Sequence, residues 1–435
     1  GGGGGGGGGG GVGGGQWVPG ISQNRMVELT SSVGRKDTYM HVFMRHMIVV
    51  LLLFILGNTG RALASDIPIT SYGAIGDGVT DDTANVQRAF DACSSEGARC
   101  VVPFGKTFKI TNRLFMWGEA GIFCQTPTDG FSFNGNGTNL INFGLRAMTV
   151  PATVWSGTLQ GCTYKVTGQP GGGGRILFFW RTDGATITQN TFLTGPYAYG
   201  PTSSGNNQAY VQNCEANAYS LTNPCVRRNI TITRNTVIAT ADNLGSEGVG
   251  LGLFDNALIE DNDIRGVGDD PIGIHFSTNI RILNNRISST DGRVFVSNSR
   301  NVIIEDNHIA RAARVSDGKF FKGIALIYIG FEHGLTSNLS APVDITIVRN
   351  VLTYPVGAID AGASIYLYGV RQTYVAYNQI YSYSTTQPTI QGIYILPFPF
   401  SGTWTDPDGL DPSHVARVHA VTLHNNSTTS GPVGL

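Results

Sequence analysis

The hexapeptide IEDNDI (Ile259–Ile264) returns as ILNNRI (Ile282–Ile287) and again as IEDNHI (Ile304–Ile309). Each copy has an apolar residue, two polar residues, an Asn, any residue and a second apolar residue. Five further copies, the last three looser than the rest, occupy Ile187–Phe192, Ile232–Val237, Ile347–Leu352, Val375–Ile380 and Leu423–Thr428. The chain is therefore built from a repeated short unit.

The spacing of the repeats predicts a solenoid. Successive Asn residues are 45, 27, 23, 22, 43, 28 and 48 residues apart, and self-similarity at such periods is typical of stacked coils. The short steps fit one turn, and the long steps fit either two turns or one turn with an inserted loop. Each unit reads as a short β-branched strand, a turn at Asn and a second strand. We predict an all-β parallel β-helix in which the Asn side chains hydrogen-bond to one another along the stack.

The composition agrees with this fold and excludes one class of partner. Of the 435 residues, 14% are charged, below the usual value of about 25%. The formal net charge of −1 gives no reason to expect nucleic acid, whose phosphates require a basic face. An acidic substrate would need local cations.

The first part of the chain is expected to lie outside the folded domain. Residues 1–39 open on a glycine-rich stretch that cannot build a core. Residues 40–64 combine basic Arg45 and His46, the apolar run Met47–Leu56 and a small-residue cleavage site near Ala64. This pattern predicts a signal peptide and a secreted protein without stable membrane insertion, because the apolar run is shorter than a spanning helix. Residues 65–435 are predicted to form one β-helix domain.

Six cysteines follow the predicted cleavage site. An even number in an exported chain predicts up to three disulfides. Local bridges between Cys93 and Cys100 and between Cys214 and Cys225 fit the spacing, which leaves the pairing open. The absence of a C-x-x-C pair argues against a zinc site.

The segment from residue 67 to residue 110 reads as an N-terminal cap module. It begins with YGAIGDGVTDDT (Tyr72–Thr83), continues with an amphipathic helix through Val86 and Phe90, and reaches VPFG (Val102–Gly105). This combination resembles the opening of the pectate lyase and polygalacturonase superfamily. The resemblance implies a right-handed β-helix whose N-terminal end is covered by the helix. Turn and helix-cap roles account for Asp77, Asp81 and Asp82.

Aligning the coils on their Asn residues predicts a column of carboxylates. Glu247 is expected to stack on Asp270, with Asp269 beside it and Asp291 one coil further on. Strands stack about 4.8 Å apart, so these like charges would raise the pKa of at least one carboxyl. One protonated and one ionised carboxyl are what glycoside hydrolysis uses. Solenoid turns also use such residues structurally.

The stretch Gly268-Asp269-Asp270 resembles the Gly-Asp-Asp element of polygalacturonase-type hydrolases. The resemblance implies that Asp269 and Asp270 form the acid/base pair. The sequence departs from the family pattern elsewhere, since Val237 stands where an Asp is expected and neither Gly-His-Gly nor Arg-x-Lys occurs. The nearest substitutes, and the predicted substrate-binding residues, are His275, Arg293 and Lys322.

The sequence thus predicts a secreted hydrolase of polygalacturonase-like type that acts on an extracellular polysaccharide, with uronate-containing glycans among the candidates, and requires no cofactor. A lyase or epimerase is the first alternative, in which the column would hold Ca²⁺ and Lys322 or Arg293 would assist proton removal. A non-catalytic glycan-binding or structural β-helix is the second. The oligomeric state is left open.

Aromatic residues are a weaker indication of a sugar ligand, because they also fill cores. Those expected in or near loops and strand ends are Trp155, Trp180, Trp404, Tyr197, Tyr199, Tyr210, Tyr366 and Tyr368.

Overall fold

The computed structural model describes residues 65–134, 139–146, 153–167, 174–194, 198–202, 227–243, 247–290, 292–314, 318–320, 323, 325–330, 342–358, 363–383, 391–396 and 419–428. The predicted signal peptide and the segment before it lie outside these ranges. Among the described residues, no helix is both long and apolar enough to cross a membrane.

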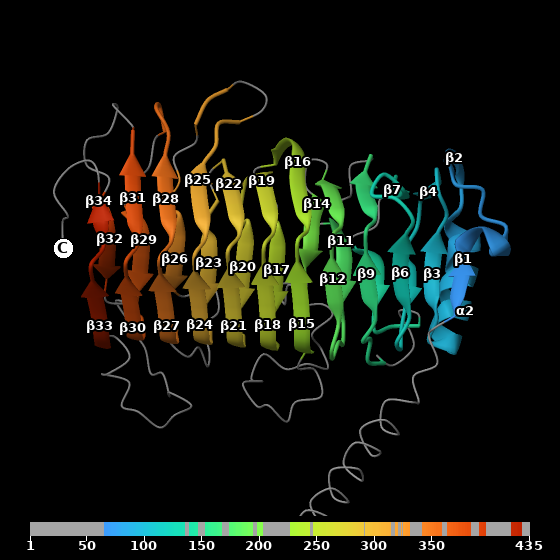
Figure 1. Cartoon of the computed structure of the whole chain (residues 1–435), viewed down its shortest axis with the longest axis horizontal. Helices are drawn as coiled ribbons and strands as arrows, with labels where there is room; N and C mark the ends of the chain where they lie inside the picture. The colour runs from blue at the N-terminus through green and yellow to red at the C-terminus, as the bar shows by residue number, and fades with distance from the viewer. Residues whose placement is uncertain are drawn as a thin grey trace, which may run out of the picture. The chain divides into compact units, whose positions relative to one another are not determined.

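Three parallel sheets run side by side along the solenoid (Figure 1). The first, sheet A, has twelve strands in the order β1 (Asp66–Pro68), β3 (Arg99–Val102), β6 (Gly121–Cys124), β9 (Thr158–Gln160), β12 (Thr186–Thr188), β15 (Arg227–Thr233), β18 (Phe254–Glu260), β21 (Thr278–Leu283), β24 (Arg300–Glu305), β27 (Val343–Val348), β30 (Arg371–Ala376) and β33 (His419–His424).

Sheet B also has twelve strands, in the order β2 (Asp77–Asp81), β4 (Thr107–Ile110), β7 (Gly130–Phe133), β10 (Thr163–Val166), β13 (Thr191–Thr194), β16 (Thr236–Asn243), β19 (Asp263–Val267), β22 (Arg286–Ser289), β25 (His308–Arg311), β28 (Val351–Tyr354), β31 (Gln379–Ser382) and β34 (Ser427–Thr428).

Sheet C has ten strands, in the order β5 (Leu114–Met116), β8 (Asn139–Phe143), β11 (Gly174–Phe179), β14 (Ala198–Thr202), β17 (Val249–Gly252), β20 (Ile272–His275), β23 (Val294–Ser297), β26 (Ile327–Gly330), β29 (Ala363–Tyr368) and β32 (Gln391–Leu396). A typical coil contributes one strand to each of the three sheets. This arrangement confirms the predicted parallel β-helix.

The repeated apolar residues build the core by stacking on their own equivalents. Ile259 pairs with Ile282, which pairs with Ile304 on the next coil, and all three are fully buried. β-Branched side chains pack well in this arrangement, because each one meets the same shape above and below.

The predicted Asn ladder is confirmed. From Asn190 onward, the side-chain amide of each Asn donates to the side-chain oxygen of the Asn on the next coil, at 2.9–3.1 Å. The ladder consists of Asn190, Asn235, Asn262, Asn285, Asn307, Asn350, Asn378 and Asn426. The long sequence steps are single turns with insertions, because Asn307 donates directly to Asn350 across a separation of 43 residues.

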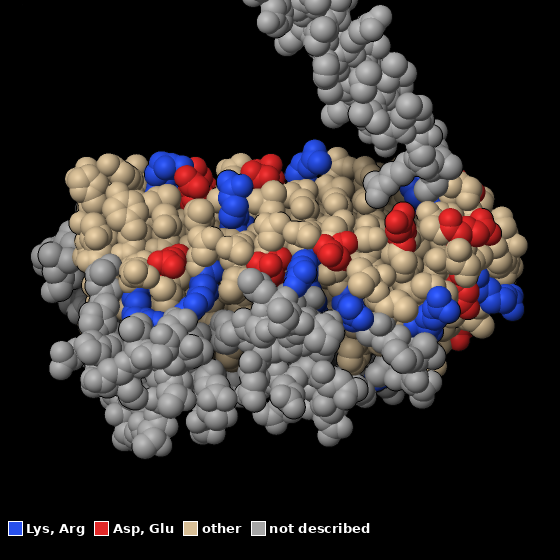
Figure 2. Space-filling view, turned by 90° about the horizontal axis from the view of Figure 1, so that it is seen from below, with Lys and Arg blue, Asp and Glu red and all other residues tan. Residues whose placement is uncertain are grey.

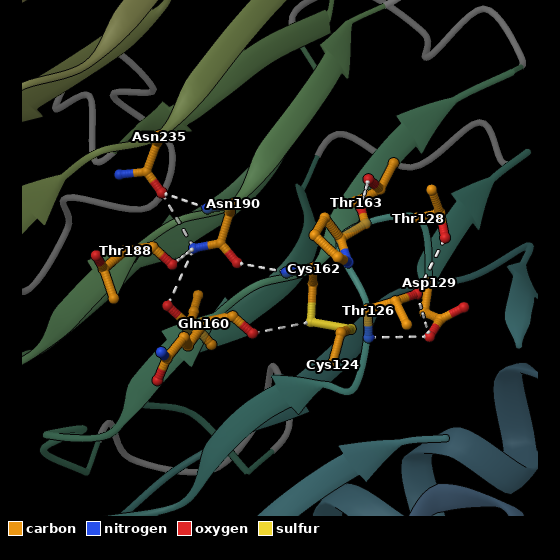
Figure 3. The surroundings of a disulfide bond; sticks show 12 residues. Cys124, Thr126, Thr128, Asp129, Gln160, Cys162, Thr163, Thr188, Asn190 and Asn235 are labelled. Carbon is orange, nitrogen blue, oxygen red and sulfur yellow. Dashed lines mark hydrogen bonds between the residues drawn. A yellow bond between two sulfur atoms is a disulfide. The ribbon is translucent and has the colours of Figure 1, made fainter. Parts of the chain in front are cut away.

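A disulfide continues this column toward the N-terminus. The backbone N–H of Cys162 donates to Asn190 Oδ1 at 3.1 Å, so Cys162 takes the ladder position one coil earlier (Figure 3). Cys162 is bonded to Cys124 on the preceding coil, a bridge that the spacing did not single out. The predicted Cys93–Cys100 bridge is present, and Cys214 and Cys225 lie outside the described residues.

The predicted helix is α2 (Thr83–Glu96), which follows the 3₁₀ turn η1 (Ile69–Tyr72). It lies at the N-terminal end of the coils (Figure 1) and buries Val86, Phe90 and Cys93 against them. Its position covers strand edges that would otherwise expose unpaired backbone groups.

Charged side chains are spread thinly over the coils. On the face shown in Figure 2, acidic and basic residues are interspersed and no large area carries a single sign. This distribution agrees with the net charge of −1.

Candidate functional site

The Gly-Asp-Asp turn connects sheet B to sheet C. Asp269 and Asp270 follow β19, and β20 begins two residues after Asp270. On the preceding coil Val249 pairs with Ile272, and Gly248 N–H donates to Asp270 O at 2.9 Å. Glu247 and Asp270 therefore occupy matching positions on neighbouring coils, as the Asn spacing predicts.

Asp270 is the most perturbed acid of the cluster. Only 5% of the residue is exposed. Burial raises the pKa of its carboxyl well above the usual range, the guanidinium of Arg293 opposes this rise, and Asp269 adds to it. A carboxyl in this environment holds its proton to higher pH than an ordinary Asp.

Asp269 has a different environment although it is the next residue. Its side chain is exposed, but the protein around it still desolvates it and raises its pKa, while Arg293 and His275 pull the pKa down. Two adjacent carboxyls, one buried and one exposed, can therefore be protonated to different extents at one pH.

Arg293 lies over the cluster from the next coil. Its Nε is 3.6 Å from Asp270 Oδ1, which is too long for a hydrogen bond. Both atoms are buried and neither has a hydrogen-bond partner among the described residues. The guanidinium also stacks on two rings, 4.7 Å from the centroid of Phe295 and 4.9 Å from that of Tyr328. These contacts fix the cation beside the carboxyl while leaving polar atoms available to a ligand oxygen.

Gly273 leaves a hollow between the acid and the histidine. A Cβ at this position would lie 3.0 Å from His275 Nε2, 3.5 Å from Asp270 Cβ and 3.8 Å from Asp270 Oδ2. The two side chains thus border the same small volume, which only glycine leaves open. The ring of His275 is held by a 2.8 Å hydrogen bond between Nδ1 and Ser297 Oγ and by an edge contact with Phe295.

The backbone of the acidic turn is fixed by the following coil. Arg293 N–H donates to Asp269 O at 3.2 Å, and a Cβ on Gly292 would come within 1.4 Å of the same oxygen. The buried Arg311 holds Gly292 in place by donating to its carbonyl and, at 2.7 Å, to that of Ala325. Gly292 and Arg311 were not anticipated from the sequence, because their role depends on contacts between coils.

The cluster brings together five of the seven predicted site residues: Glu247, Asp269, Asp270, His275 and Arg293. Asp291 and Lys322 lie outside the described residues. Among the residues that are described, no group of three or more His, Cys, Asp and Glu side chains is placed to hold a metal ion. Since Asp291 belongs to the predicted column, Ca²⁺ binding stays a prediction.

The N-terminal aspartates are structural, as predicted. Asp77 accepts from the backbone of Val79 and Thr80, and Asp81 accepts from Thr83 at the start of α2. Asp82 departs from the expected helix cap. It is fully buried and accepts instead from the backbone N–H groups of Ile75 and Gly76.

Comparison with known proteins agrees with the geometry. A family model described as "Right handed beta helix region" matches residues 223–396. The chain has the right-handed parallel β-helix fold. No curated protein sequence matches it.

Several solved structures share this β-helix. The surface adhesin PfbA of Streptococcus pneumoniae is 13% identical, with 84% of this chain and 97% of that one covered and a TM-score of 0.50. DFA-IIIase from Arthrobacter chlorophenolicus A6, solved in complex with GF2, is 12% identical, with 82% and 98% covered and a TM-score of 0.50. The Dettilon tailspike protein is 13% identical, with 82% and 68% covered and a TM-score of 0.49. At these identities the likeness to PfbA and to DFA-IIIase shows the fold alone.

The β-helix also carries a row of aromatic residues that the sequence did not reveal. Phe295 pairs with Tyr328, Tyr328 with Tyr366, and Tyr366 with Tyr394 on consecutive strands of sheet C. Inserted segments separate Phe295 from Tyr328 and Tyr328 from Tyr366, so the Asn steps do not align these two pairs. Tyr366 and Tyr394 are 28 residues apart, as Asn350 and Asn378 are. Tyr366 was expected in or near a loop or strand end but lies within β29.

The remaining predictions for aromatic residues have mixed outcomes. Trp155 is fully buried, and its indole N–H donates to Ala120 O at 2.8 Å, so it is a core residue. Trp180 is half-buried beside Phe178. Trp404, Tyr197 and Tyr210 lie outside the described residues.

Proposed function

We propose that this β-helix protein hydrolyses glycosidic bonds of an extracellular polysaccharide. The observation that carries the proposal is the pair Asp269 and Asp270. Burial raises the pKa of Asp270 strongly, whereas Asp269 is exposed and lies within the influence of Arg293 and His275. A carboxyl that keeps its proton beside one that ionises more readily is the arrangement on which glycoside hydrolysis depends.

In the proposed reaction Asp270 is the general acid. Its protonated carboxyl donates to the glycosidic oxygen as the bond to the anomeric carbon breaks, and the leaving sugar departs as an alcohol. Water supplies the new hydroxyl, and its proton passes to the ionised Asp269. Glu247 stands on the neighbouring coil, where its charge helps to keep Asp270 protonated.

Arg293 and His275 are proposed to bind the sugar next to the bond that is cleaved. His275 Nε2 and Asp270 border the hollow over Gly273, and Arg293 Nε lies at the same carboxyl. A substrate hydroxyl in this hollow would reach all three groups.

The solved structures are compatible with a carbohydrate ligand and also with the non-catalytic alternative. One protein of this fold was solved with GF2 bound, and another is a surface adhesin. Two disulfides among the described residues support folding in an oxidising compartment, and hence secretion.

A product assay tests the proposal. The full-length protein and its Asp270→Asn variant are incubated with pectic, alginate and neutral polysaccharides, with and without EDTA. New reducing ends without the ultraviolet absorbance of unsaturated uronates, lost in the variant, are the expected result. Both signals together, abolished by EDTA, would identify a Ca²⁺-dependent lyase. Binding without any product would identify a glycan-binding protein.

A further inference from the structure

The outer face of sheet C changes character at the acidic cluster. One outward column contains Gly250, Gly273, Phe295, Tyr328, Tyr366 and Tyr394 on six consecutive strands. The two glycines lie beside the carboxylates. Every position on the C-terminal side of them is aromatic.

The three tyrosines of this column, which we term the tyrosine row, are packed against each other. The rings of Tyr328 and Tyr366 stack at 5.0 Å with an angle of 6° between their planes. The rings of Tyr366 and Tyr394 are 5.3 Å apart and tilted. Because neighbouring rings cover each other's faces, a ligand on this face would meet mainly ring edges.

The outer part of the row is open to a ligand. Tyr328 is buried, whereas Tyr366 and Tyr394 are half-buried. Tyr368, two positions after Tyr366 on β29, is also half-buried. Burial raises the pKa of Tyr366 and Tyr368 above that of a free phenol. Their hydroxyls therefore stay protonated at neutral pH and can both donate to and accept from a sugar hydroxyl.

Beyond Arg293, whose guanidinium stacks on Phe295 and Tyr328, the strands of this face carry no charged side chain. The four strands β23, β26, β29 and β32 contain no Asp, Glu, Lys or Arg. After Lys322 the whole sequence has only three cationic residues besides His, namely Arg349, Arg371 and Arg417. Arg349 is paired with Glu305 and Asp306, Arg371 is buried in sheet A, and Arg417 lies outside the described residues. A polyuronate over β29 and β32 would therefore meet no cationic side chain on the strands beneath it.

We propose that the tyrosine row binds uncharged sugar units of the glycan on the C-terminal side of the acidic cluster. This inference rests on the proposed function and specifies its substrate: the part of the glycan that lies over β29 and β32 is neutral. Coils repeat about every 4.8 Å, close to the length of one sugar unit, so an extended glycan along the axis meets one tyrosine per unit. The amphipathic phenol suits such a ligand, since it offers apolar ring carbon and one hydroxyl.

Binding by the full-length Asp270→Asn variant tests the inference, because this protein does not degrade its ligand. The probes are oligosaccharides of xylan, β-glucan, galactan, arabinan and fructan as the neutral set, and of galacturonan and alginate as the charged set. We expect binding to at least one neutral oligosaccharide. Binding should tighten as the probe lengthens from two units to six.

Substitutions in the same background then locate the contact. Tyr366→Ala should weaken binding of the six-unit probe about tenfold, a loss of roughly 1.4 kcal/mol, and leave the two-unit probe nearly unchanged. Tyr366→Phe, which keeps the stacked ring, should give a smaller loss. Tyr374→Ala is the matched control, because Tyr374 is 38% exposed and lies on β30 of sheet A, one strand later in the chain.

The outcomes separate this inference from the proposed function. Binding only to galacturonan or alginate, equal effects of Tyr366→Ala and Tyr374→Ala, or no binding to any probe would overturn the tyrosine-row assignment, while hydrolysis by the unmodified protein would still support the proposed function. Tyr366-dependent binding of a neutral probe, without cleavage by the unmodified protein, would support the assignment and refute the hydrolase.

Discussion

Arg293 Nε and Asp270 Oδ1 lie 3.6 Å apart on successive coils, both buried and each without a hydrogen-bond partner among the described residues. A purely structural ion pair would close this distance, because a buried charge without hydrogen bonds is costly. The open pair agrees with a site that is completed by a ligand oxygen.

The first prediction concerns the stability of the Asp270→Asn variant. Burial raises the pKa of Asp270 in the folded protein well above that of an ordinary aspartate, so the folded state keeps this proton to higher pH than the unfolded state. The unmodified protein therefore loses stability as the pH rises from the unfolded-state pKa of an aspartate, about 3.9, through the raised pKa of the folded state. Asn does not titrate, and the variant should melt higher than the parent at neutral pH, by about 2 °C or more, with the difference shrinking near pH 4. Thermal melts of the two proteins across this pH range measure the difference in melting temperature. A difference that is largest at acid pH would contradict the assigned direction of the pKa shift.

The second prediction concerns the alkaline limit of activity. Arg293 lowers the pKa of Asp270 against the larger effect of burial. Arg293→Gln removes that charge, so Asp270 should stay protonated to higher pH and the alkaline limb of the kcat profile should move upward. The KM should rise as well if Arg293 contacts substrate. A limb that moves to lower pH would show that the charge acts on another group.

The third prediction tests the hollow over Gly273. Gly273→Ala would place a methyl group 3.0 Å from His275 Nε2. Because Ala is at least as well tolerated as Gly in a strand, we expect a melting temperature within about 2 °C of the parent. Activity should fall by tenfold or more, since the methyl group takes the space of a substrate atom. Full activity in the variant would mean that the substrate binds elsewhere.

The fourth prediction concerns the Asn ladder. Asn285 Oδ1 accepts from both the backbone and the side-chain N–H of Asn262, and its own amide donates to Asn307 and Ile259. Asn285→Ala leaves several buried polar groups without hydrogen-bond partners, at a cost of about 1–3 kcal/mol each. The free energy of unfolding should therefore fall by about 3 kcal/mol or more. Arg286→Ala, an exposed change one residue away, is the control. Similar denaturation midpoints for the two variants would refute a structural role of the ladder.

The sequence predicted those features that repeat with the coil. The Asn spacing predicted the ladder, the stacked isoleucines and the alignment of Glu247 with Asp270. Each of these features repeats at the same interval as the Asn residues. The spacing did not predict Cys124–Cys162, Gly292 beside Asp269, or the tyrosine row. The disulfide precedes the first Asn of the repeat, and insertions give Phe295–Tyr328 and Tyr328–Tyr366 sequence steps of 33 and 38 residues that differ from the Asn steps. Gly292 does lie one Asn step of 23 residues after Asp269, but the spacing does not show how closely the two backbones approach.

The most direct test of the proposed hydrolysis is to trace the oxygen atom of water into the products. The full-length protein is incubated with the polysaccharide panel in water enriched in heavy oxygen, and the products are analysed by mass spectrometry. Hydrolysis through Asp270 predicts one heavy oxygen at each new reducing end and no labelled product from the Asp270→Asn variant. Unlabelled unsaturated products, or labelled products formed equally by the variant, would contradict it.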